Sequence, residues 1–154
     1  MESGAKVHLA SGAIGGFDVL QTVTLMAQAQ GLPETAGIET HTGAKGFRNT
    51  PVWAEHLLTD TEKTTVFTGN AKQAIATFPR RVNVAVATSL ATTGPESTGV
   101  TMHSVPGWVG DDHCITAEIE GVKAVVDICS STSAIAGWSA VSLLRNLASP
   151  VCFY

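Results

Sequence analysis

Five histidines are the side chains of this sequence best suited to proton transfer, because imidazole has an ordinary pKa of ~6.5. They are His8, His41, His56, His103 and His113. His113 stands apart because it follows the loop 107–112 (GWVGDD) and enters a β-rich stretch, where functional residues are often found. We expect Asp111 or Asp112 to orient its ring and favour the imidazolium form, and Trp108 to supply an apolar wall. These local features leave two interpretations open, a catalytic acid–base pair of His113 and Asp112 or a surface histidine without a catalytic task, and alone they favour the surface histidine.

Other catalytic signatures do not occur in the sequence. There is no GxGxxG after a strand, no GxxxxGK[ST], no GxSxG and no HExxH. The three cysteines, Cys114, Cys129 and Cys152, are far apart and form no CxxC pair. We expect them to be reduced thiols of a cytoplasmic protein, and we expect no metal site.

Composition limits the function classes further. The chain has 154 residues, 44% of them hydrophobic and 14% charged, with a net charge of −4. This predicts one folded domain over 1–154 that is too acidic for a general nucleic-acid binder. No apolar run approaches the ~18 residues of a membrane span, and no secretory signal is visible. The low charge favours self-association, since part of the surface is then apolar enough to be buried against another subunit.

Hydrophobic periodicity and turn residues predict alternating helices and strands. Helices are expected at 17–30, ending at Gly31, at 51–58, at 71–78 with Asn70 as N-cap, and at 132–147. Strands are expected at 37–42, 64–68, 100–105, 114–120 and 122–129, the last two as a hairpin, and residues 151–154 are β-like. Segment 82–91 fits either a strand or a buried helix. The order lacks a regular βαβ rhythm, so we expect an α+β fold.

Four segments carry a family resemblance. They are SGAIGGFDVL (11–20), FTGNAKQAIATFPRRVNVAVATSLA (67–91), DDHCITAEIEG (111–121) and SAIAGWSAVSLLRNLASPV (133–151). In this order they resemble the C-terminal domain of L-aspartate dehydrogenase, an NAD(P)-dependent enzyme that interconverts aspartate and iminoaspartate or oxaloacetate. The resemblance implies a mixed, mainly antiparallel sheet covered by helices, which serves substrate binding and dimerisation. It also implies that His113 is the catalytic acid–base and that Ser11, Gly12, Ala13 and Ile14 lie beside the nicotinamide and the substrate.

The sequence departs from the family beside His113. The family has Asn-Thr where this chain has Asp111-Asp112, and two carboxylates there would repel a dicarboxylate substrate. Arg80, Arg81 and Arg145 are the candidates for binding substrate carboxylates. We expect Trp108, Asp111 and Trp138 to contribute to substrate binding together with the segment 11–14.

The family's N-terminal Rossmann domain is not found in these 154 residues. If the chain is complete, we expect a cofactor-independent enzyme of the isomerase or cyclase type acting on a small molecule, which binds NAD(P) only when a Rossmann partner is supplied. One alternative is a fragment or split subunit of NAD(P)-dependent L-aspartate dehydrogenase. Another is a non-catalytic dimerisation or ligand-binding domain. In each case we expect a homodimer, with the hairpin 114–120 and 122–129 as its interface.

Overall fold

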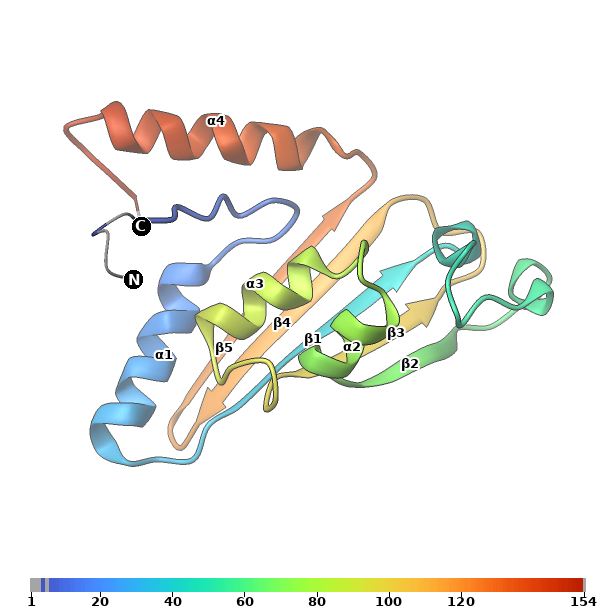
Figure 1. Cartoon of the computed structure of the whole chain (residues 1–154), viewed down its shortest axis with the longest axis horizontal. Helices are drawn as coiled ribbons and strands as arrows, with labels where there is room; N and C mark the ends of the chain where they lie inside the picture. The colour runs from blue at the N-terminus through green and yellow to red at the C-terminus, as the bar shows by residue number, and fades with distance from the viewer. Residues whose placement is uncertain (1–3, 5, 154) are drawn as a thin grey trace.

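A five-stranded sheet forms the centre of the fold, in a computed structural model that describes residues 4 and 6–153 (Figure 1). The strands are β1 (Thr35–Thr42), β2 (Thr64–Asn70), β3 (Gly99–Ser104), β4 (Asp111–Ile119) and β5 (Val122–Ser130). Their order across the sheet is β2-β3-β1-β4-β5. β1 pairs in parallel with β3, and the other neighbours are antiparallel. The structure therefore confirms the α+β class and the mixed, mainly antiparallel sheet.

Among the described residues, three α-helices pack against one face of this sheet and a fourth lies apart. They are α1 (Phe17–Gln30), α2 (Ala71–Thr77), α3 (Asn83–Ala91) and α4 (Ala134–Ala148), and two 3₁₀ helices, η1 (Ala44–Phe47) and η2 (Glu55–Leu58), follow β1. In Figure 1, α2 and α3 lie in front of the sheet and α1 lies to its left, whereas α4 stands away from it beside the N-terminal segment.

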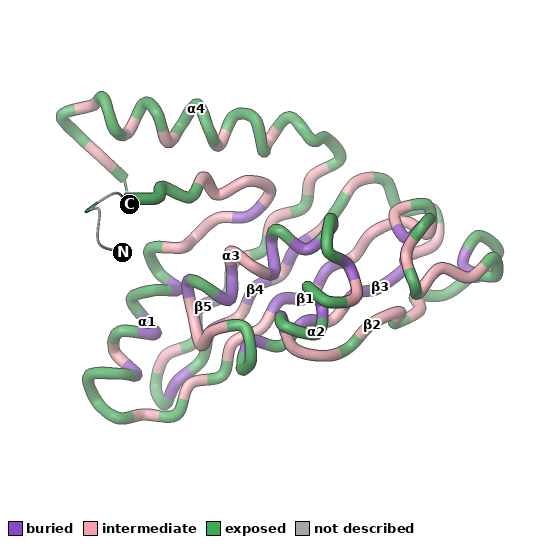
Figure 2. Tube along the Cα trace, in the orientation of Figure 1, coloured by how far each residue is buried: buried purple, intermediate pink, exposed green. Residues whose placement is uncertain are grey.

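The core lies between the sheet and α1–α3. Along α1 the buried residues are Leu20, Val23, Thr24 and Ala27, which recur at the three- and four-residue spacing of one helix face. They meet a strand face on which Ile38, Val100 and Ile115 are at most 3% exposed. Figure 2 shows this concentration of buried residues at the sheet and its covering helices, with α4 exposed or half-buried along its length.

Most of the expected elements occur near their expected positions. Gly31 takes the left-handed conformation at the end of α1, and Asn70 caps α2 in a capping box with Gln73. The ambiguous segment 82–91 is the helix α3, with buried residues on the side that meets β1 and α1.

Two local expectations were wrong. In segment 51–58 only Glu55–Leu58 is helical, as a 3₁₀ turn, and Pro51 lies in the turn before it. Within 151–153, the described part of the expected terminal strand, no strand forms. Among the described residues, no helix is long and apolar enough to cross a membrane.

Candidate active site

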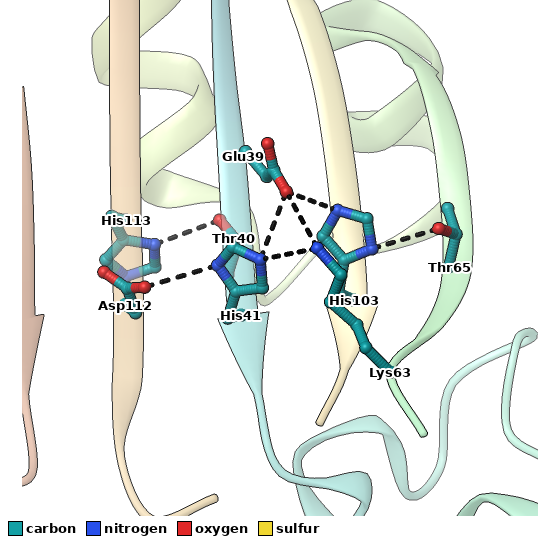
Figure 3. A network of polar contacts seen from close by, with 8 residues as sticks. All are labelled: Glu39, Thr40, His41, Lys63, Thr65, His103, Asp112 and His113. Carbon is teal, nitrogen blue, oxygen red and sulfur yellow. Dashed lines mark hydrogen bonds and ion pairs between the residues drawn. The ribbon is translucent and has the colours of Figure 1, made fainter. Parts of the chain in front are cut away.

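His113 lies on the face of β4 that the helices cover, and the residue is 6% exposed. Its register partner on β1 is Thr40, and the Thr40 Oγ1 and His113 Nδ1 atoms are 3.0 Å apart (Figure 3). Thr40 either donates this hydrogen bond to Nδ1 or accepts it, depending on the tautomer of the ring. Thr40 therefore holds the Nδ1 side of the His113 ring.

A cavity of about 490 Å³ opens beside His113. Its lining includes the polar residues Thr40, Thr42, Thr50, Arg81, Asn83, Asp111 and His113, and the apolar residues Phe47, Phe78, Val82, Val100 and Met102. This mixture of apolar walls and a few convergent polar groups is typical of a small-molecule site. A wider hollow of about 740 Å³ lies over segment 48–59, but its histidine, His56, has a largely exposed side chain. The cavity at His113 is therefore the better candidate.

Burial lowers the pKa of His113 below its ordinary value of 6.5, although the charges of Asp111 and Asp112 act to raise it. The two carboxylates therefore act in the expected direction, toward the imidazolium form, but burial outweighs them. Removing the charged imidazolium ring from water costs more free energy than its attraction to the two carboxylates contributes. At neutral pH His113 is uncharged and is better suited to accept a proton than to donate one.

Asp112 lies on the opposite face of the sheet from His113, because neighbouring residues of a strand point to opposite faces. Its Oδ2 atom is 3.3 Å from Nδ1 of His41. The structure therefore does not bring Asp112 together with His113, and Thr40 contacts the ring in its place. Of the two carboxylates, Asp111 lines the cavity and Asp112 does not.

The remaining substrate-binding candidates are dispersed. Ala13 lines the cavity, whereas Ile14 is a core residue with 3% exposure. Ser11 and Gly12 lie outside the lining, and the backbone N–H of Gly12 donates a hydrogen bond to Ser139 Oγ at 2.9 Å. The two candidate tryptophans, Trp108 and Trp138, are 37% and 70% exposed and also lie outside the lining.

Of the three arginines considered for carboxylate binding, Arg81 lines the cavity. Its guanidinium donates hydrogen bonds to the backbone carbonyls of Gly46 and Arg48. Arg80 is exposed and does not line the cavity, and Arg145 lies on the exposed helix α4. Sequence reasoning missed Thr40, although the alternation of Ile38, Thr40 and Thr42 indicated a shared face of one strand.

The chain is similar to known aspartate dehydrogenases. The sequence profile of the family described as "Aspartate dehydrogenase, C-terminal" matches residues 23–147. L-aspartate dehydrogenase 3 of Bordetella bronchiseptica is 28% identical over 97% of this chain and 56% of its own length. L-aspartate dehydrogenase of Methanosarcina acetivorans is 34% identical over 97% of this chain and 57% of its own length. The chain thus spans about half the length of the curated relatives it matches.

A solved structure is also similar to this chain in fold. The crystal structure of an aspartate dehydrogenase from Thermotoga maritima superposes with a TM-score of 0.76 at 28% identity, covering 97% of this chain and 56% of the other.

These relatives overturn the main functional expectation, a cofactor-independent isomerase or cyclase. Each is named as a dehydrogenase, and their similarity runs through nearly the whole of this chain. That expectation depended on treating the chain as complete. The findings favour the alternative, a fragment or split subunit of L-aspartate dehydrogenase.

The lowered pKa of His113 predicts a pH-dependent stability. Because the unfolded chain takes up a proton on this residue at a higher pH than the folded chain does, the free energy of unfolding should fall as the pH drops below about 6.5. His113→Gln, which cannot titrate in this range, should make that fall shallower in urea denaturation measured between about pH 8 and 5. His56→Gln, which removes an exposed histidine, serves as the control substitution. An unchanged slope in His113→Gln would contradict the burial argument.

Proposed function

Because the chain belongs to the family of aspartate dehydrogenase C-terminal domains, we propose that it forms the substrate-binding and proton-transfer part of an L-aspartate dehydrogenase. The observation that carries the proposal is the cavity that has His113 and Arg81 in its lining. It offers a group for proton transfer and a cation for a carboxylate, both of which a charged amino-acid substrate requires.

Each residue has a separate task in this proposal. Arg81 binds a substrate carboxylate, because a guanidinium has five N–H donors and its two backbone contacts leave others free. His113 takes a proton from the substrate's ammonium group at the ring nitrogen that does not face Thr40. Phe47 and Phe78, each 2% exposed, form apolar walls that keep water from the bound substrate.

The described residues do not fit a nicotinamide dinucleotide by themselves. A dinucleotide's pyrophosphate is usually bound by free backbone N–H groups where a helix begins after a glycine-rich turn. At the junction of β2 and α2 these groups are already used: the N–H groups of Ala71, Lys72 and Gln73 donate to Thr98 O, Pro95 O and Asn70 Oδ1, each at 2.9 Å.

The start of α1 offers no alternative. Its first turn carries Asp18, whose charge opposes a phosphate. Gly16 there is explained by packing, since a Cβ atom at this position would clash with Cγ2 of Val126. We therefore place the dinucleotide on a part of the enzyme outside the described residues.

The surface of α4 provides a place for that part to dock. No residue of α4 is buried, and Trp138, Val141, Leu144 and Leu147 are 49–70% exposed. Val7, Leu9, Val151 and Phe153 add further exposed apolar side chains at the two ends of the described chain. The relatives are about twice as long as this chain. We propose that their unmatched half, as a dinucleotide-binding part, covers α4. The homodimer through β4 and β5 remains a separate prediction.

Arg81 gives the direct test of substrate class. The chain should bind oxaloacetate and succinate more tightly than acetate in NMR titrations, with shifts at His113 and the cavity lining. Arg81→Ala should weaken dicarboxylate binding by about 10-fold or more, as expected for losing a hydrogen-bonded ion pair. Arg80→Ala, which changes an arginine next in sequence but outside the lining, should bind like the wild type. Equal effects of the two variants, or no dicarboxylate binding, would refute the substrate assignment.

To test docking on α4, the chain is mixed with the dinucleotide-binding half of the L-aspartate dehydrogenase from Methanosarcina acetivorans. Backbone amides of α4 should exchange more slowly with solvent in the mixture than in the chain alone. Trp138→Glu should abolish this protection without unfolding the chain, because no α4 residue is buried in its core. Leu25→Glu, at a 64% exposed leucine of α1, serves as the matched control and should preserve it. If α4 gains no protection, another surface binds the partner.

A further inference from the structure

The sheet face away from α1–α3 carries a second group of chemically active side chains. Glu39 and His41 lie two residues apart on β1 and therefore point to the same face. The parallel register of β1 and β3 places His103 directly beside His41. The two imidazole rings are stacked, with centroids 4.9 Å apart (Figure 3).

One oxygen and two nitrogens of this group converge. Glu39 Oε1 is 2.7 Å from His103 Nε2 and 3.1 Å from His41 Nε2, and the three atoms all lie within 4.8 Å of one another. Ligand atoms in a tetrahedral zinc site, at about 2.0–2.1 Å from the ion, are about 3.4 Å apart. Small side-chain rotations therefore suffice to place an ion among the three.

The second nitrogen of each ring has its own partner. His103 Nδ1 is 3.0 Å from Thr65 Oγ1, and His41 Nδ1 is 3.3 Å from Asp112 Oδ2. Among the described residues, His41 Nδ1 and Asp112 Oδ1 are buried without a hydrogen bond of good geometry, so a slight turn of the His41 ring would complete one. Metal-binding histidines usually donate their other ring N–H to such a group, often a carboxylate. This arrangement leaves both Nε2 atoms for one ligand.

A positive charge already lies at the point of convergence. Lys63 Nζ is 3.4 Å from His41 Nε2 and 3.5 Å from Glu39 Oε1. The side chain of Lys63 is half exposed, just before β2, and can withdraw on its flexible stem. Asp127, which lies close enough to Asp112 that this neighbour raises its pKa, adds negative charge on the same face.

We propose that Glu39, His41 and His103 bind a divalent first-row transition metal ion such as Zn²⁺, which takes the position of the Lys63 ammonium group. Two imidazoles and one carboxylate suit such ions and leave at least one coordination position for water or another ligand. The expectation of no metal site considered the cysteines and did not weigh this group.

This site is distinct from the cavity. Thr40, between the two β1 ligands, points to the other face and contacts His113. The ion would link β1 to β3 directly. Through the contact of Asp112 with His41 it would also be connected to β4, and through the contact of Thr65 with His103 to β2. Loss of the metal would therefore leave dicarboxylate binding by Arg81 in place, so the two proposals can fail separately.

The test titrates the 154-residue chain with Zn²⁺ in a calorimeter and with Co²⁺ followed by visible absorption, using Mg²⁺ as a hard-cation control. We expect one equivalent of Zn²⁺ or Co²⁺ to bind and Mg²⁺ not to bind. His41→Ala and His103→Ala should each abolish stoichiometric binding, and Asp112→Asn should weaken it by about 10–100-fold. His56→Ala, at an exposed histidine that also contacts a carboxylate, should bind like the wild type.

Lys63→Met provides a variant that does not remove a ligand. It deletes the competing cation at a half-exposed position, so the affinity for Zn²⁺ should rise while circular dichroism stays unchanged. The proposal is overturned if neither the wild type nor Lys63→Met binds one equivalent of Zn²⁺ or Co²⁺. It is equally overturned if binding survives both histidine substitutions, or if Co²⁺ shows a thiolate charge-transfer band, which would assign the metal to a cysteine such as Cys114.

Discussion

β1 is hydrogen-bonded along both edges, in parallel to β3 and antiparallel to β4, so its side chains must alternate strictly between the two faces of the sheet. Ile38 and Thr40 face the helices, where Ile38 joins the core and Thr40 holds His113. Glu39 and His41 face the other way and meet His103. A slip of one residue in this strand would exchange the two sets, so both sites depend on the same register.

Burial decides the chemical state of His113. Two carboxylates precede it in the sequence, yet the strand sends Asp112 to the opposite face, and desolvation outweighs the charges of both. The result is a neutral imidazole held by a hydroxyl beside a cavity that also contains a guanidinium. These are the properties required of a group that accepts a proton from a bound, charged amino acid. The exposed apolar side chains of α4 form the surface on which we propose that a further part of the enzyme docks.

Local sequence signals were sufficient for much of the fold. The Asn70 cap, the glycine after α1 and the Glu120–Gly121 turn of the hairpin each depend on neighbours within a few residues, and the elements they bound were predicted. Segment 82–91 stayed ambiguous because an Ala- and Val-rich buried helix has no polar face to mark its period.

The sites were less predictable because they depend on long-range register. His113 was identified by its loop and by family resemblance, whereas its partner Thr40 is 73 residues away in the chain. The Glu39–His41–His103 group requires the parallel pairing of β1 with β3, which no local pattern reveals. Trp138 was proposed for the substrate site, but it lies on a helix outside the cavity lining.

The most direct measurement of the central claim is the turnover of oxaloacetate, ammonia and NADH by the chain assembled with a dinucleotide-binding half from a relative. With a neutral His113 as the proton-transfer group, His113→Ala should lower kcat by about 10²–10⁴, with a much smaller change in the KM for oxaloacetate. Thr40→Val, which removes the hydroxyl that holds the ring, should cause a smaller loss of kcat. Full activity of His113→Ala in a correctly folded assembly would show that the buried histidine does not transfer the proton.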